Sequence, residues 1–142
     1  MLVSKIILDN EQDSINLAIK LAQSLGKGDI VTFTGDLGCG KTFLCRQIIQ
    51  FFCGSNINVI SPTFNLLQTY QAKDFTIYHF DLYRLNSPEE VYELGIEDGL
   101  QNNLCIIEWP ELVEHLLPRP IIKVKLEINK NNQRVGDICT IK

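Results

Sequence analysis

Long apolar runs, an excess of basic residues and paired cysteines are all missing from this sequence. No apolar stretch approaches the roughly 18 residues that a membrane-spanning helix needs, and no charged-then-apolar leader follows Met1. The five cysteines are odd in number and contain no Cys-x-x-Cys pair, which is typical of reduced thiols. The formal net charge of -4 argues against a large basic surface for nucleic acid. We therefore expect a cytoplasmic protein that contacts no membrane and contacts RNA only indirectly.

Internal repeats, low-complexity tracts and linkers are absent as well. The chain has 142 residues, which suits one hydrophobic core and makes two improbable. Hydrophobic residues make up 45% of the chain and charged residues 21%, as in an ordinary globular protein. These numbers predict a single domain over residues 1–142.

Helical and strand patterns alternate along most of the chain. The predicted fold is therefore α/β, a P-loop NTPase-like three-layer sandwich with a mixed, mostly parallel sheet and a C-terminal antiparallel hairpin. Asp9 and Gln12 are spaced as a capping box at the first helix, and the helix that follows Ser87 is expected to lie on the surface. The expected helices are Asp9–Leu25, Lys41–Cys53 and Ser87–Leu94, and the expected strands are Ile30–Thr34, Phe64–Tyr70, Phe75–Phe80, Leu104–Ile107 and a hairpin within Ile121–Ile141.

A glycine-rich motif lies between the first predicted strand and the second predicted helix. Gly35-Asp36-Leu37-Gly38-Cys39-Gly40-Lys41-Thr42 matches G-x-x-x-x-G-K-[ST], the P-loop pattern, in the context that this pattern requires. The glycines let backbone N–H groups approach phosphate oxygens, and the helix N-terminus favours negative charge. Lys41 then supplies a positive charge to the β and γ phosphates, and the Thr42 hydroxyl ligates magnesium. The residues expected to bind ATP here are Leu37, Gly38, Cys39, Gly40, Lys41, Thr42 and Phe43.

Two acidic residues end predicted strands and compete for the second metal position. Mg²⁺ in such a site needs a carboxylate at the tip of a neighbouring strand. Glu108 follows a continuous apolar run and is the preferred ligand, with Asp81 as its rival. Either acid has an ordinary alternative role, as a helix cap or as a solvated strand end.

Three further features bear on nucleotide chemistry. Thr63, in Ser61-Pro62-Thr63-Phe64, occupies the connection in which related folds keep a γ-phosphate-sensing switch, although Ser-Pro-Thr is more often an ordinary turn. His79 lies in strand alternation, where a lone histidine is usually structural. Asn129-Lys130-Asn131-Asn132 lacks the carboxylate of a guanine-specific Asn-Lys-x-Asp segment, which favours ATP over GTP.

Four motifs together resemble the bacterial TsaE family, also called YjeE. The resemblance covers about Asp9 to Pro118, leaves out the last hairpin, and is more specific than a P-loop alone. The chain departs from the family in one respect, since Cys39 stands where the family commonly has alanine. The motifs are the P-loop, Ser61-Pro62-Thr63-Phe64, His79-Phe80-Asp81-Leu82-Tyr83-Arg84 and Ile107-Glu108-Trp109-Pro110.

The resemblance implies an ATPase of the machinery that makes tRNA N6-threonylcarbamoyladenosine (t6A37). It also implies that the chain binds the TsaD–TsaB heterodimer, which transfers the threonylcarbamoyl group, and that ATP hydrolysis resets this complex between turnovers. By position, Thr63 belongs to the switch segment, Asp81 acts in hydrolysis, and Glu11 approaches the adenine. The catalytic set implied is Lys41, Asp81 and Glu108, and the metal set is Thr42 and Glu108.

Several alternatives remain open on the sequence alone. A small-molecule kinase would use the same phosphate cradle, but it needs an acceptor pocket and a lid for which little chain is left. A binding switch would act through its ATP-bound state without hydrolysis. Trp109 either flanks the site or lies in the core, and Arg84 either acts on the phosphates or forms a surface ion pair. No arginine finger is evident, which predicts slow hydrolysis by the isolated chain.

Overall fold

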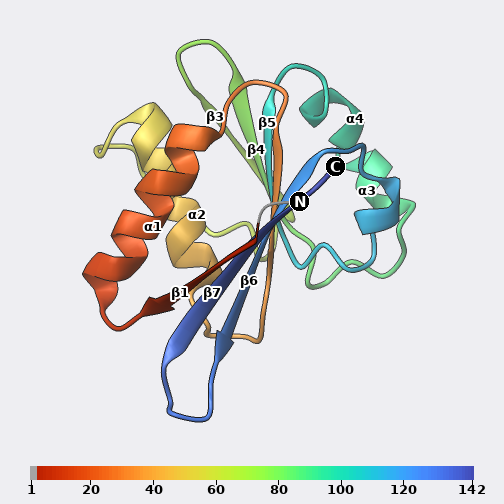
Figure 1. Cartoon of the computed structure of the whole chain (residues 1–142). Helices are drawn as coiled ribbons and strands as arrows, with labels where there is room; N and C mark the ends of the chain where they lie inside the picture. The colour runs from red at the N-terminus through yellow and green to blue at the C-terminus, as the bar shows by residue number, and fades with distance from the viewer. Residues whose placement is uncertain (1–2) are drawn as a thin grey trace.

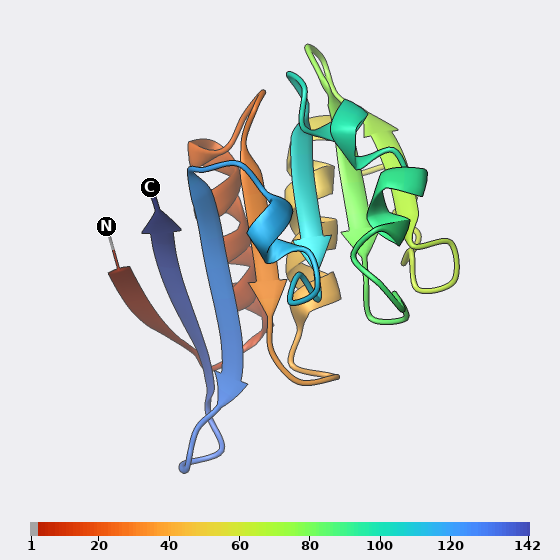
Figure 2. The ribbon, with the colours of Figure 1, turned by 90° about the vertical axis from the view of Figure 1, so that its right-hand side faces the viewer.

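The fold, given by a computed structural model that describes residues 3–142, is built on one mixed seven-stranded sheet. The strand order is β1-β7-β6-β2-β5-β4-β3, which Figure 2 shows from one end of the sheet to the other. Strands β6, β2, β5 and β4 pair in parallel, and the outer pairs are antiparallel. The strands are β1 (Val3–Leu8), β2 (Ile30–Thr34), β3 (Leu67–Gln71), β4 (Thr76–Asp81), β5 (Leu104–Glu108), β6 (Ile121–Ile128) and β7 (Arg134–Ile141).

Helices cover both faces of the sheet and make three layers, as predicted. Helices α1 (Glu11–Ser24) and α2 (Lys41–Cys53) lie on one face, and α3 (Glu90–Glu93), α4 (Ile96–Gly99) and the short 3-10 helix Glu114–Leu116 lie on the other (Figure 1). Successive strand residues point to opposite faces, so β2 sends Val31 and Phe33 into the core under α1 and α2. Ile30 of the same strand joins the second core.

The sheet topology brings three strand ends together. In the register of the parallel strands, Phe33 of β2 pairs with Glu108 of β5, which pairs in turn with Asp81 of β4. Parallel strands end at the same edge of a sheet, and in α/β sheets ligands bind at that edge. The P-loop leaves β2 at this edge, so the loop and both predicted carboxylates share one end of the molecule.

Two expectations about local structure were wrong, and one strand was not predicted. The first helix is capped by Asn10, whose side chain accepts a hydrogen bond from the backbone N–H of Asp13, and not by Asp9. Strand β3 begins three residues later than predicted, at Leu67, since the segment before it forms a turn. Strand β1 lay outside the predicted elements. It pairs with β7, which lies 126 or more residues away in the sequence (Ile7 pairs with Val135). The periodicity of a short segment does not indicate such a distant pairing.

The helical segment after Ser87 is shorter than predicted and, as predicted, lies on the surface, with only Val91 of its four residues buried. Helix α3 starts at Glu90 and has only four residues, and its Val91 is fully buried in the second core. One apolar residue per turn is enough to anchor so short a helix to the sheet. Within residues 3–142, no helix has the length and apolar character required to cross a membrane.

Candidate nucleotide and metal site

Close backbone packing explains the first glycine of the P-loop. A Cβ on Gly35 would lie 2.3 Å from the carbonyl oxygen of Leu126 in β6, at a positive φ of 141°. No side chain fits between the loop and β6, so glycine is required at this position. The loop then runs to Gly40, the N-cap of α2, which also has a left-handed φ and makes no side-chain cap. The first N–H groups of α2 are therefore free of a side-chain cap, as anion binding at a helix N-terminus requires.

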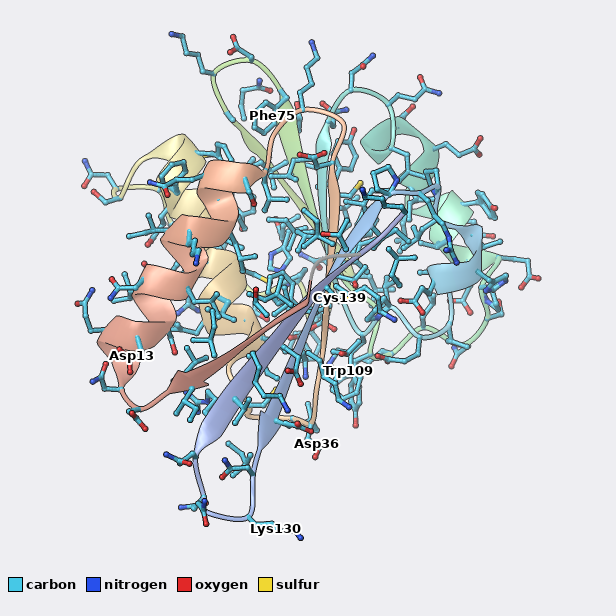
Figure 3. The ribbon with its side chains drawn as sticks, viewed as in Figure 1. Asp13, Asp36, Phe75, Trp109, Lys130 and Cys139 are labelled. Atoms are coloured by element: carbon cyan, nitrogen blue, oxygen red, sulfur yellow. The ribbon has the colours of Figure 1, made fainter. Side chains whose placement is uncertain are left out.

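Lys41 folds back over its own loop. Its Nζ donates to the carbonyl oxygens of Gly35 and Asp36, the second at 3.1 Å, and lies 4.0 Å from the ring centroid of Trp109. Figure 3 places Trp109 and Asp36 at the same end of the molecule. The side chain of Lys41 is buried, so its charge is held by carbonyl dipoles and by the face of the indole ring. Trp109 therefore flanks the site, which is one of the two positions that were expected for it.

Thr42 and Glu108 meet although 66 residues separate them. The Thr42 hydroxyl donates to Oε1 of Glu108 at 2.8 Å, and Glu108 is 1% exposed. The hydroxyl uses its hydrogen in this bond and keeps its oxygen lone pairs available for a cation. A hydroxyl and a carboxylate are the hard oxygen ligands that Mg²⁺ prefers. These two residues therefore fit the predicted magnesium ion.

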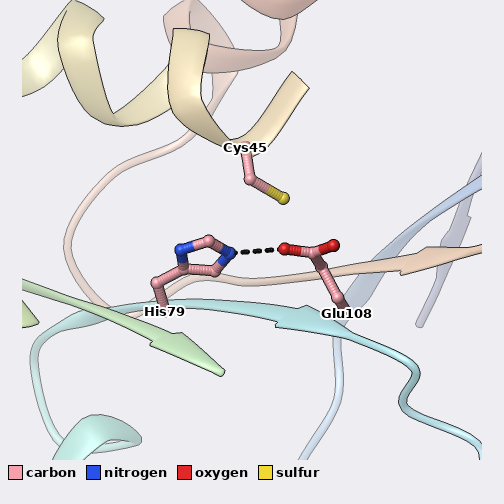
Figure 4. A group of neighbouring side chains, drawn as sticks. All are labelled: Cys45, His79 and Glu108. Carbon is pink, nitrogen blue, oxygen red and sulfur yellow. Dashed lines mark hydrogen bonds and ion pairs between the residues drawn. The ribbon is translucent and has the colours of Figure 1, made fainter. Parts of the chain in front are cut away.

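A buried thiol and imidazole lie behind the carboxylate. Ligand atoms of Cys45, His79 and Glu108 are all within 4.8 Å of one another (Figure 4). A soft cation such as Zn²⁺ would need the thiolate of Cys45. Burial raises the pKa of Cys45 well above its ordinary value, and the negative charges of Glu108 and Asp81 raise it further. Without a bound cation, the fold therefore favours the neutral thiol at Cys45.

Asp81 lines the same hollow over the P-loop as Thr42 and Glu108. One carboxylate oxygen accepts from the backbone N–H of Tyr83 at 3.1 Å, and the other is 3.5 Å from the hydroxyl of Thr63. Burial raises the pKa of Asp81 above its ordinary value; the hydrogen bond from Tyr83 opposes this rise, and the charge of Glu108 adds to it. A carboxylate whose pKa is raised holds protons more strongly, which suits a base.

Most of the predicted site residues line one hollow. Its volume is about 300 Å³, and it lies directly over the P-loop. Cys39 is an exception, because its side chain is buried beneath the loop and its backbone N–H bonds to the carbonyl of Asp36. The predicted residues that line the hollow are Leu37, Gly38, Gly40, Lys41, Thr42, Phe43, Thr63, Asp81 and Glu108.

Glu11 lies in a second hollow of about 570 Å³ on the other side of Gly40. Gly40 and Phe43 line both hollows, so Glu11 is next to the P-loop but apart from the metal residues. Thus the hollows divide the predicted site into a phosphate and metal part and a second part that holds the predicted adenine contact.

The sequence analysis missed the contribution of the last hairpin. Arg134, at the start of β7, lines the hollow of Glu11, and its guanidinium would be 3.6 Å from a Cβ placed on Gly40. Its Nε is buried and has no hydrogen-bond partner among residues 3–142. A lone arginine in an exposed-looking hairpin carries no local signal, and the motifs that carry the family resemblance end before it. Tyr83, whose ring lies 4.8 Å from that of Trp109 at an interplanar angle of 47°, was missed as well.

Arg84 contacts an exposed aromatic ring. Its guanidinium carbon is 4.9 Å from the ring centroid of Phe64, a side chain that is 81% exposed. It forms no ion pair with the acids of the described chain. The structure thus shows no surface ion pair for Arg84 among residues 3–142, and a role on the phosphates stays a prediction.

Comparison with known proteins shows the family of this chain. The family model "Threonylcarbamoyl adenosine biosynthesis protein TsaE" matches residues 8–136, which include most of the last hairpin. A tRNA threonylcarbamoyladenosine biosynthesis protein TsaE of Rickettsia felis is 59% identical over 135 residues, 95% of this chain and 79% of that protein. The protein of the same name from a Nostoc species is 34% identical, covering 98% of this chain and 90% of its own.

A solved structure supports the fold. The crystal structure of Bacillus subtilis YdiB superposes with a TM-score of 0.76 over 99% of this chain and 87% of that one, at 23% sequence identity. At this identity the likeness concerns the fold alone. The family model and the relatives extend over most of the chain, and it therefore belongs to the TsaE family.

Proposed function

We propose that this chain is the ATPase component of tRNA N6-threonylcarbamoyladenosine synthesis. It binds ATP with Mg²⁺ and hydrolyses it to support repeated turnover of the TsaD–TsaB complex. The observation that carries this proposal is the bond from Thr42 to Glu108 directly beside a complete P-loop. The names of the relatives support the process, since they are TsaE proteins of threonylcarbamoyladenosine biosynthesis.

The phosphate end of the site follows from the loop. Backbone N–H groups at the start of α2 bind phosphate oxygens, and Lys41 leaves the carbonyls of Gly35 and Asp36 to bind the β and γ phosphates. Bound Mg²⁺ would neutralise charge that develops on the phosphoryl oxygens. Thr42 and Glu108 would hold it.

Asp81 is proposed to position and deprotonate the attacking water. It is 6% exposed and lines the same hollow as Lys41 and Thr42, so a water on its carboxylate can face the terminal phosphate. Its raised pKa makes it a stronger base than an exposed aspartate. Thr63, beside Asp81, is proposed to sense the γ-phosphate.

The site is open on one side, and we propose that the partner proteins close it. Leu37 and Tyr83 line the smaller hollow, yet they are 68% and 50% exposed. Phe64, which follows the lining residue Thr63 in the chain, is 81% exposed. Apolar side chains exposed around a polar site favour a protein contact. Exclusion of water on contact would strengthen the charges in the site, which fits slow hydrolysis by the isolated chain.

The test is ATP hydrolysis by the purified chain with and without the TsaD–TsaB pair of its own host. We expect a low basal rate that the pair stimulates, and loss of both rates in Lys41→Ala and Glu108→Ala. Lys125→Ala is the matched control, because this lysine is 62% exposed and lies outside both hollows. Phosphorylation of a small-molecule acceptor, with no response to the pair, would identify a kinase instead.

The same variants separate hydrolysis from a binding switch. Glu108→Ala is expected to bind ATP and the pair, yet to fail in repeated turnover of threonylcarbamoyl transfer. Full turnover by this variant without hydrolysis would show that the bound state alone acts on the partner, and the ATPase part of the proposal would fail.

A further inference from the structure

Behind the proposed metal ligand lies a fully buried histidine. His79 of β4 is 0% exposed, and its Nε2 is 2.7 Å from Oε2 of Glu108 (Figure 4). Glu108 accepts a hydrogen bond from the Thr42 hydroxyl at Oε1, so the histidine is bound to the other oxygen of the same carboxylate. The thiol of Cys45 lies beside this pair, with the ligand atoms of all three residues within 4.8 Å of one another.

Packing alone does not account for this pair. Burying an imidazole and a carboxylate removes two well-hydrated groups from water, and apolar residues of similar volume often fill such space at no loss of stability. The other ring nitrogen of His79, Nδ1, is buried without a hydrogen-bond partner in the described chain. An unpaired buried polar atom destabilises the fold, so the histidine adds a further cost that an apolar side chain would avoid.

The hydrogen bond restricts the rotation of the carboxylate. The last torsion of a glutamate is broad and has no strong preference of its own. With the imidazole bound to Oε2, the plane of the carboxylate is fixed and Oε1 faces the Thr42 hydroxyl. A ligand held in place before the cation arrives loses less conformational freedom on binding. Partners of this kind behind a metal ligand are typically worth 10–100-fold in metal affinity.

We propose that His79 is a positioning residue that orients the carboxylate of Glu108 toward Thr42 and the Mg²⁺ of the nucleotide. This inference rests on the proposed function, because it takes Glu108 as a metal-side carboxylate. His79 acts through Glu108 and touches neither the nucleotide nor the reacting atoms, so it is distinct from Lys41 and Asp81. This proposal gives His79 a functional role, whereas its position in strand alternation alone predicts a structural one.

Two amides of similar size test the position of the donor. His79→Gln places its N–H₂ group near Nε2 and keeps the bond to Glu108, whereas His79→Asn places it near Nδ1, too far from that carboxylate. His79→Phe keeps a ring and removes both nitrogens. Ile77→Val, on the same strand and also fully buried, is the control for loss of packing without loss of the donor.

Calorimetry measures the binding of a non-hydrolysable ATP analogue at increasing Mg²⁺ concentrations. The quantity compared between variants is the Mg²⁺ concentration that gives half-maximal binding. Binding of the same analogue in excess EDTA and the melting temperature are recorded for every variant. His79→Asn and His79→Phe are expected to raise the Mg²⁺ requirement about tenfold, with binding in EDTA changed by less than about twofold. His79→Gln and Ile77→Val are expected to keep the requirement of the original chain.

Each outcome decides the inference. Folded Asn and Phe variants with an unchanged Mg²⁺ requirement would make His79 structural only. If these two variants do not fold, Gln still decides, because a tenfold rise in a well-folded Gln variant would contradict the role of the donor. Glu108→Gln separates the two proposals: if it leaves the Mg²⁺ requirement unchanged, the proposed metal role of Glu108 has failed, and with it the basis for His79.

Discussion

At the scale of single residues, the folded chain disfavours the ionised form of Asp81. Its burial raises the pKa of the carboxyl, so the charged form is less stable in the folded chain than in the unfolded chain. A raised carboxyl pKa contributes stability at low pH, and this contribution is lost as the pH rises through the folded value. At neutral pH the ionised Asp81 therefore destabilises the protein, as is common for residues that act in a site.

This argument predicts a pH-dependent effect of Asp81→Asn. The amide oxygen of asparagine still accepts from the N–H of Tyr83, and the charge is gone. The variant is expected to melt at a higher temperature than the original chain at pH 7.5, and this advantage should shrink as the pH falls toward the ordinary aspartate value of about 3.9. Melting curves across this range provide the measurement. A constant difference at all pH values would show that the charge of Asp81 is not the cause.

The fluorescence of the single tryptophan, Trp109, is expected to report the position of the Lys41 ammonium. The lysine ammonium lies 4.0 Å from the ring centroid of Trp109, and Tyr83 contacts the same ring. When phosphates draw Lys41 away from the ring, the electrostatic environment of the indole changes. We therefore predict that addition of ATP shifts the intrinsic tryptophan emission of the chain in a saturable way.

The control for this fluorescence titration is Lys41→Met, which keeps a long side chain and removes the ammonium. Its emission without nucleotide should already differ from that of the original chain, and ATP should change it little. An equal response in both proteins would mean that the signal does not report the movement of Lys41.

At the scale of elements, the hairpin of β6 and β7 forms a wall of the nucleotide hollow. Gly35 lies against the backbone of β6, and Gly40 lies against Arg134 at the start of β7. The P-loop is thus packed between its own helix and a hairpin more than 80 residues later in the chain. Arg134 brings a positive charge to the hollow that contains Glu11, and its Nε has no hydrogen-bond partner among residues 3–142.

We predict that Arg134→Ala weakens ATP binding about tenfold, the loss of roughly 1.4 kcal/mol that one charge-assisted hydrogen bond provides. The melting temperature should change little, because Nε of Arg134 has no partner in the described chain whose bond would be lost. Calorimetric titration with ATP is the measurement. Lys130→Ala at the tip of the same hairpin removes an equal charge from an exposed position and should leave affinity intact. Equal losses in both variants would indicate a general effect of charge.

At the scale of the whole molecule, the site is assembled from separate parts of the sheet. The loop after β2, the ends of β4 and β5, and the hairpin of β6 and β7 each contribute lining residues. A ligand that touches all of these parts stabilises them together, because it binds the folded chain and not the unfolded one.

Saturating ATP with Mg²⁺ is therefore expected to raise the melting temperature in one cooperative transition. The gain at 100 times the dissociation constant is about 2.7 kcal/mol. Scanning calorimetry measures both the shift and the number of transitions. Lys41→Ala should show no shift, and a ligand-induced split into two transitions would show that the parts of the sheet do not unfold as one unit.

Local chemistry determined the P-loop, the strand before it and the helix after it, because glycines, a lysine and a threonine in one contiguous segment suffice to specify them. Apolar runs ending in Asp81 and Glu108 likewise indicated two strand ends, and the four resembling motifs indicated the family that the comparisons confirm. Tertiary structure decided which of these residues meet. The contacts of Glu108 with Thr42 and His79 span 66 and 29 residues, and Arg134 reaches Gly40 from the last hairpin. Such contacts depend on strand order and register across the sheet, including β1 at its edge, and local periodicity carries no information about either.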